Sequence, residues 1–80
     1  MASNTARDDF GFKITKHFGV ISTSRSGWTK ELNLVSWNSH EPKLDIREWD
    51  ETHLRMSRGI TLTTEEMKVI IKLIDENGLD

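Results

Sequence analysis

Four runs along the chain alternate apolar and polar residues, which is the pattern of a strand with one buried face. They cover residues 10–22, 28–38, 43–50 and 56–62, and short polar connections separate them. The segment at 22–27 consists of serine, threonine, arginine and glycine, and the chain's one proline lies in the second connection. Both compositions are typical of turns. The pattern therefore predicts four consecutive strands.

The first two runs differ in how regularly they alternate. In the first, Phe12, Ile14 and Phe18 have the same parity, so they are expected on one face of a long strand. In the second, Leu34 and Trp37 have opposite parity although both are apolar. A bulge or a strong twist would reconcile this pattern with a strand, and the sequence does not decide between these two possibilities.

The third run separates its side chains most clearly. Leu44 and Ile46 point one way and are expected in the core, whereas Arg47 and Trp49 point the other way. A cation beside a large aromatic ring on an open face suits single-stranded nucleic acid, whose bases can stack. The alternative is that the same two residues form a cross-strand surface pair or a cation–π contact and bind no ligand.

A helix is predicted after the fourth run. Thr63 and Glu66 form a capping-box pattern, and Asn77-Gly78 supplies a stop signal. Gly59, just upstream, predicts a bulge or the close approach of another backbone. Apolar residues recur on one helical stripe at Met67, Ile70, Ile71 and Ile74.

One helix covers a four-stranded sheet poorly and leaves both sheet edges open. The chain has 80 residues, so a core built by one copy alone would be marginal. A two-fold homodimer would supply the missing burial. The predicted dimer interface is the helical stripe, Met67, Ile70, Ile71 and Ile74.

Composition narrows the function classes. The chain is 35% hydrophobic, lacks cysteine, and carries a formal net charge of −2, which disfavours a generic nucleic-acid binder. However, residues 10–62 hold eight cations and six anions, so the predicted sheet is mildly basic and the acid lies at the ends. We find no apolar membrane segment and no secretion signal, and we expect a cytoplasmic protein, with association with the nucleoid as an option.

No constellation for catalysis or metal binding is visible. His17, His40 and His53 lack metal-ligand spacing, and Asp45 and Glu48 lie on opposite faces of the predicted strand. We therefore expect no metal, no cofactor and no enzymatic activity.

Three blocks of sequence resemble a known family. Residues 45–49, Asp-Ile-Arg-Glu-Trp, are followed at 58–63 by Arg-Gly-Ile-Thr-Leu-Thr and then by an apolar helix. This order is similar to that of the transcriptional positive cofactor four family of single-stranded DNA-binding domains. The stretches at 27–38 and 41–43 resemble its bacterial YdbC branch more narrowly.

The resemblance implies an α+β fold in which a strongly curved, four-stranded antiparallel sheet precedes one C-terminal helix, in a dimer. It implies binding residues at Arg47, Trp49 and Arg58, and the YdbC branch adds Trp28, Lys30 and Trp37. Lys13 and Lys43 are added if the lysines converge on one groove. Both Trp28 and Trp37 could instead anchor a core or an interface, because they do not share a face.

The sequence thus predicts a disordered tail at residues 1–9 and one domain at residues 10–78. The domain is expected to bind single-stranded DNA with little sequence preference, as a transcription or DNA-maintenance factor. RNA binding or an RNA-chaperone role is an alternative use of the same sheet, and a protein-interaction module is a further alternative.

Overall fold

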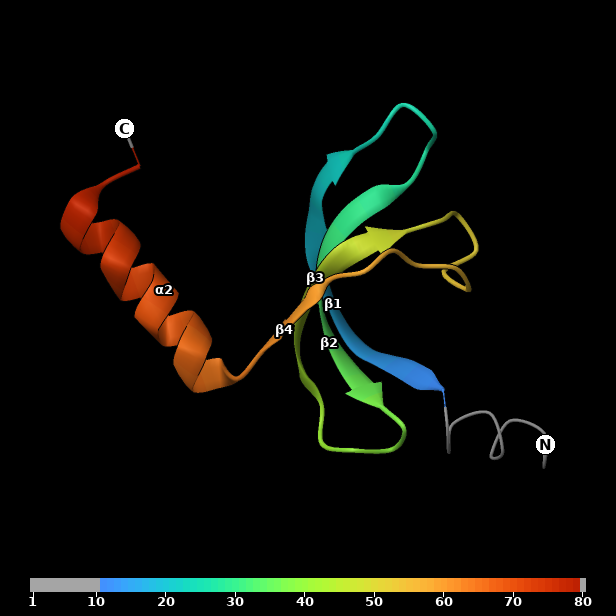
Figure 1. Ribbon diagram of the computed structural model, residues 1–80, viewed down its shortest axis with the longest axis horizontal. Coiled ribbons are helices and arrows are strands. Elements are labelled where there is room, and N and C mark those ends of the chain that lie inside the picture. Colours follow the sequence, from blue (N-terminus) through green and yellow to red (C-terminus); the bar gives the residue numbers. More distant parts are fainter. Residues whose placement is uncertain (1–10, 80) are drawn as a thin grey trace.

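The computed structural model describes residues 11–79, and these form one antiparallel sheet followed by one helix (Figure 1). The strand order in the sheet is β1-β2-β3-β4, so each strand pairs with its sequence neighbour. This confirms the predicted α+β fold. The predicted tail at residues 1–9 lies outside the described residues. The elements are β1 Phe12–Thr23, β2 Thr29–Trp37, β3 Lys43–Trp49, β4 Ile60–Leu62 and α2 Thr64–Asn77.

The fourth strand is shorter than predicted. Only Ile60–Leu62 is paired along β3, and the run from residue 56 contributes a single isolated bridge between Met56 and Trp49. The intervening chain reaches β3 instead through Ser57, whose amide N donates to the carbonyl oxygen of Glu48 at 2.9 Å. The connection between β3 and β4 is therefore longer than the alternation suggested.

Irregular pairing occurs between β1 and β2, where the register shifts three times, between Ile14 and Lys16, between His17 and Gly19, and between Val20 and Ser22. At each shift β1 carries one extra residue, which is the signature of a β-bulge. The expectation that Phe12, Ile14 and Phe18 share a face by simple parity is therefore wrong for Phe18. The extra residues are Thr15, Phe18 and Ile21.

The register defines two faces of the sheet, because directly paired residues point to the same side. We call inner face the side that carries the pairs Asn33–Asp45, Glu31–Arg47 and Thr29–Trp49. We call outer face the side that carries the pairs Lys30–Glu48, Leu32–Ile46 and Leu34–Leu44.

The sheet curves strongly around its inner face. Phe12 pairs with Trp37 at one end of β2, whereas Trp49 pairs with Thr29 at the other end. Eight residues of extended strand separate those ends, about 26 Å at roughly 3.3 Å per residue. Yet the rings of Phe12 and Trp49 have centroids only 5.1 Å apart. Figure 1 shows both ends of the β1–β2 hairpin bending to the side away from α2. The predicted strong curvature is confirmed.

Helix α2 begins as the sequence predicts. The hydroxyl of Thr63 accepts from the backbone N of Glu66 at 3.0 Å, and the Glu66 carboxylate accepts from the backbone N of Thr63 at 2.9 Å. At the other end Gly78 adopts a positive φ of 77° and its N–H donates to the carbonyl oxygen of Ile74. No residue of α2 is buried within this chain. Its apolar stripe is therefore left largely accessible, with Met67 half-buried.

Candidate nucleic-acid interface

Trp49 lies in the interior of the curved sheet and has no exposed surface. Its ring stacks on the ring of His53 at 5.7 Å and meets Phe12 on the inner face. The prediction that this face is open is therefore wrong at Trp49, because curvature folds the sheet over the odd-numbered side chains of β3. A base has no surface of Trp49 on which to stack.

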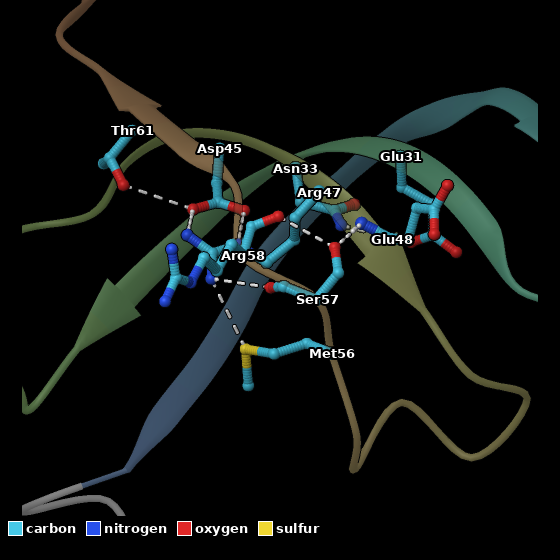
Figure 2. A network of polar contacts seen from close by, with 9 residues as sticks. All are labelled: Glu31, Asn33, Asp45, Arg47, Glu48, Met56, Ser57, Arg58 and Thr61. Atoms are coloured by element: carbon cyan, nitrogen blue, oxygen red, sulfur yellow. Dashed lines mark hydrogen bonds and ion pairs between the residues drawn. The ribbon is translucent and has the colours of Figure 1, made fainter.

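Arg47 is also engaged within the chain, as Figure 2 shows. Its Nε and Nη2 donate to the two carboxylate oxygens of Asp45 at 2.6 and 2.8 Å, a bidentate pair. Its guanidinium lies 4.5 Å from the ring centroid of Trp37, and Nη1 donates to the carbonyl oxygen of Ser57 at 3.4 Å. The Arg47 side chain is 13% exposed. Its charge is thus already matched, and its observed contacts tie the β3–β4 connection to the inner face.

Buried polar groups extend this network along the inner face. Asp45, Asn33 and Glu31 are all at most 2% exposed. Asp45 also accepts from the hydroxyl of Thr61 at 3.3 Å, which links β3 to β4 (Figure 2). Since an unpaired buried carboxylate would be very unfavourable, these contacts stabilise one arrangement of the strands.

Glu31 is the second buried carboxylate. It accepts hydrogen bonds from Thr29 at 2.5 Å, Asn33 at 3.1 Å and His53 at 2.8 Å. Burial by itself would raise its pKa, but these hydrogen bonds and the charge of His53 outweigh burial, so the pKa of Glu31 is lowered. His17 lies 3.6 Å from the same carboxylate. Neither histidine was singled out by the sequence as a partner of Glu31, because both contacts join distant strands or loops.

A hollow of about 540 Å³ opens beside Glu31, and its lining includes two further acids, Asp50 and Glu51, together with His17 and His53. Desolvation opposes ionisation of Asp50, but hydrogen bonds from the Thr52 hydroxyl and nearby backbone N–H groups prevail and lower its pKa. A concave site bearing three carboxylates repels phosphate. This hollow is therefore unsuited to a polyanion.

A second hollow, of about 380 Å³, brings together three of the sequence-predicted residues, Lys30, Arg47 and Arg58. Lys30 and Arg58 are exposed, and neither forms an ion pair within residues 11–79. We call this hollow the basic groove; its other lining residues are Ile46, Glu48, Ser57, Gly59 and Ile60.

Gly59 lines the groove at a point where the chain passes very close to β3. A Cβ at this position would collide with the carbonyl oxygen of Ile46 and with the Cβ of Arg47, so only glycine allows the chain to run this close to β3. The predicted close approach of another backbone is confirmed. It holds the neighbouring Arg58 beside the strand that carries Arg47 (Figure 2).

The remaining predicted residues are dispersed. Lys13 pairs with Ser36 and shares the outer face with Lys30, whereas Lys43 pairs with Val35 on the inner face, and both lysines are exposed. Trp28 and Trp37 are half-buried, and Trp37 contacts Phe12 and Arg47. The structure thus places Lys30 and Arg58 in the same groove, whereas Lys13 and Lys43 do not line it.

The helical residues predicted for a dimer interface stay largely accessible. Ile70, Ile71 and Ile74 are 37%, 53% and 39% exposed, and Met67 is half-buried. No helix in the described part of the chain is long and apolar enough to cross a membrane. Within residues 11–79, no cluster of histidine and carboxylate side chains could hold a metal ion.

Comparison with known proteins agrees with this geometry. Residues 24–73 match the family described as Transcriptional Coactivator p15 (PC4). The chain is also 40% identical, over 73 residues, to a protein of Treponema pallidum (strain Nichols) named only as uncharacterized. That alignment covers 91% of this chain and 86% of the relative. The chain therefore belongs to the Transcriptional Coactivator p15 (PC4) family.

Proposed function

We propose that this protein binds single-stranded DNA with little sequence preference and acts as a transcription or DNA-maintenance factor. The family supports nucleic-acid binding, and the basic groove is the observation that carries the proposal for this chain. Lys30 and Arg58 are exposed cations that form no ion pair within residues 11–79, and they line the groove together with the apolar side chains of Ile46 and Ile60. Such a groove offers both phosphate neutralisation and apolar contact with bases.

The contacts support different proposed roles for the predicted residues. Lys30 and Arg58, with Lys13 on the same face, are proposed to meet phosphates directly. Arg47 and Trp49 are proposed to hold the fold that presents them, since both are engaged on the inner face. A place in the bacterial YdbC branch, and action in the cytoplasm, stay predictions.

The direct test is a fluorescence titration of the protein with labelled oligothymidine, beside a duplex of equal length. We expect tighter binding to the single strand and an affinity that falls as salt rises, because phosphate contacts release counterions. A matched RNA strand decides between DNA and RNA preference. Absence of binding to any strand at low salt would refute the proposal and favour the alternative, a protein-interaction module.

We also propose that the protein is a homodimer. In this chain most of the apolar stripe of α2 stays accessible, with Ile70, Ile71 and Ile74 37%, 53% and 39% exposed. A second copy would cover the same surfaces on both subunits, as two-fold symmetry requires. Monomer-sized sedimentation at micromolar concentration would contradict this. Ile71→Glu should convert the dimer to monomer, whereas Glu65→Gln, in the exposed first turn, should leave it intact.

A further inference from the structure

We propose that Phe18, with Lys16 beside it, is the platform on which this protein stacks an unpaired nucleobase. This inference rests on the proposed binding of single strands and assigns one of its contacts. Phe18 is 47% exposed, and every other phenylalanine or tryptophan side chain within residues 11–79 is less accessible. Its parity alone predicts a regular strand position on one face with Phe12 and Ile14.

The bulge explains why this ring is accessible. Phe18 is the extra residue between His17 and Gly19, which pair with consecutive residues of β2. A bulged residue has no partner directly opposite it, so its side chain is not held within the ladder of either face. Strand β1 is moreover at the edge of the sheet that residues 11–79 form, since β2 is its one paired neighbour there. The ring thus lies at an open border, where a flexible strand can reach it.

A cation lies next to the ring. Nζ of Lys16 is 4.8 Å from the ring centroid of Phe18. Lys16 pairs with Leu34, which places it on the outer face with Lys13 and Lys30. A nucleotide has a flat base joined through its sugar to a charged phosphate. An exposed aromatic ring can stack on the base while an adjacent ammonium group contacts the phosphate.

The other aromatic rings are less suitable. Trp49 is fully buried, and Trp37 is contacted by the ring of Phe12 and the guanidinium of Arg47. Trp28 and Phe12 are half-buried. Since stacking needs a free ring face, Phe18 is the best placed of the five aromatic residues from 11 to 79.

The test compares two ligands of equal length and charge, oligothymidine and an abasic strand without bases. Phe18→Leu keeps an apolar side chain and removes the aromatic face. We expect it to weaken oligothymidine binding by about 5- to 150-fold, the effect of losing one stacked base, and to leave abasic-strand binding unchanged. Lys16→Gln should weaken binding to both strands.

Ile21→Ala is the matched control. Ile21 is also an extra residue of β1 and is 55% exposed, but it has no aromatic face. Its variant should bind oligothymidine as the unmodified protein does. Circular dichroism and size-exclusion elution of all three variants should match the unmodified protein, because the substituted side chains are largely exposed.

The outcomes separate this inference from the proposed function. If the unmodified protein binds oligothymidine but Phe18→Leu binds it equally well, the stacking platform is refuted and the proposed function stands. If Phe18→Leu weakens binding to oligothymidine and to the abasic strand equally, Phe18 does not act through the base, and the inference is again refuted. If the unmodified protein binds neither strand, both the proposed function and this inference fail.

Discussion

The inner and outer faces of the sheet are formed by the same strands, yet they differ in how far one chain buries and pairs their side chains. On the inner face, the buried carboxylates of Asp45 and Glu31 are matched by Arg47, by histidine and by hydroxyl and amide donors. On the outer face, Ile60 stays exposed, and Lys30 and Arg58 of the basic groove form no ion pair within residues 11–79. The difference separates residues that hold this fold together from the exposed residues that we propose bind the nucleic acid.

The largest expected effect comes from Trp49, because it is fully buried on the inner face. Trp49→Ala should lower the free energy of unfolding by about 3–5 kcal/mol, measured by urea denaturation at one fixed protein concentration. Trp49→Phe should cost much less, since it keeps an aromatic ring and removes an indole N–H that is buried and has no hydrogen-bond partner within residues 11–79. An unchanged stability of Trp49→Ala would place this residue outside the core.

Asp45→Ala should destabilise the protein by about 3 kcal/mol, because it leaves the mostly buried guanidinium of Arg47 without its bidentate partner. Lys43→Ala, an exposed change two residues away on the same strand, should stay within about 0.5 kcal/mol of the unmodified protein. The comparison is made from urea midpoints. Equal midpoints for the two variants would show that the inner-face network contributes nothing to stability.

Gly59→Ala probes the boundary between the two faces. The added methyl group meets the backbone of Ile46, so we expect a loss of about 1–3 kcal/mol and weaker binding of oligothymidine through displacement of Arg58. Gly19→Ala is the control, because a Cβ there meets nothing within 4 Å. A Gly59→Ala variant that is as stable as Gly19→Ala would contradict the close approach.

The smallest effect is on the pH dependence of stability. The pKa of Glu31 is lowered from its ordinary value of 4.5 in the folded chain, so Glu31 stabilises the fold above that value. This contribution is lost as the pH falls through the lowered pKa. Urea midpoints from about pH 6 to about pH 3 should therefore fall less steeply in Glu31→Gln than in the unmodified protein. Glu41→Gln, at an exposed position, should show the same fall of urea midpoint with pH as the unmodified protein. If the midpoint of Glu31→Gln falls just as steeply, Glu31 does not contribute to the pH dependence of stability.

The elements of the fold follow from local patterns, which explains why they could be predicted. The capping residues Thr63 and Glu66 and the glycine at 59 act on their immediate neighbours, so the sequence displays them directly. The alternation in β3 likewise separates Leu44 and Ile46 from Arg47 and Trp49 correctly. Parity assigns residues to two faces without saying which face the curvature encloses.

The candidate site depends on that curvature, and it was therefore predicted less well. Three bulges in β1 and a contact between Phe12 and Trp49 across the sheet decide that the odd-numbered side of β3 is interior. Neither feature has a local signature in the sequence. The exposure of Phe18 has the same origin, because a period-two pattern treats a bulged residue as an ordinary strand position.

The most direct measurement is the salt dependence of oligothymidine binding by the double variant Lys30→Ala with Arg58→Ala. A control variant of the same charge change, Lys68→Ala with Lys72→Ala, alters only exposed lysines of α2. If the basic groove contacts two phosphates, the slope of log affinity against log salt should decrease in magnitude by about 1.4 in the first variant alone. Equal affinities and slopes in the two variants would contradict the assignment of binding to the basic groove.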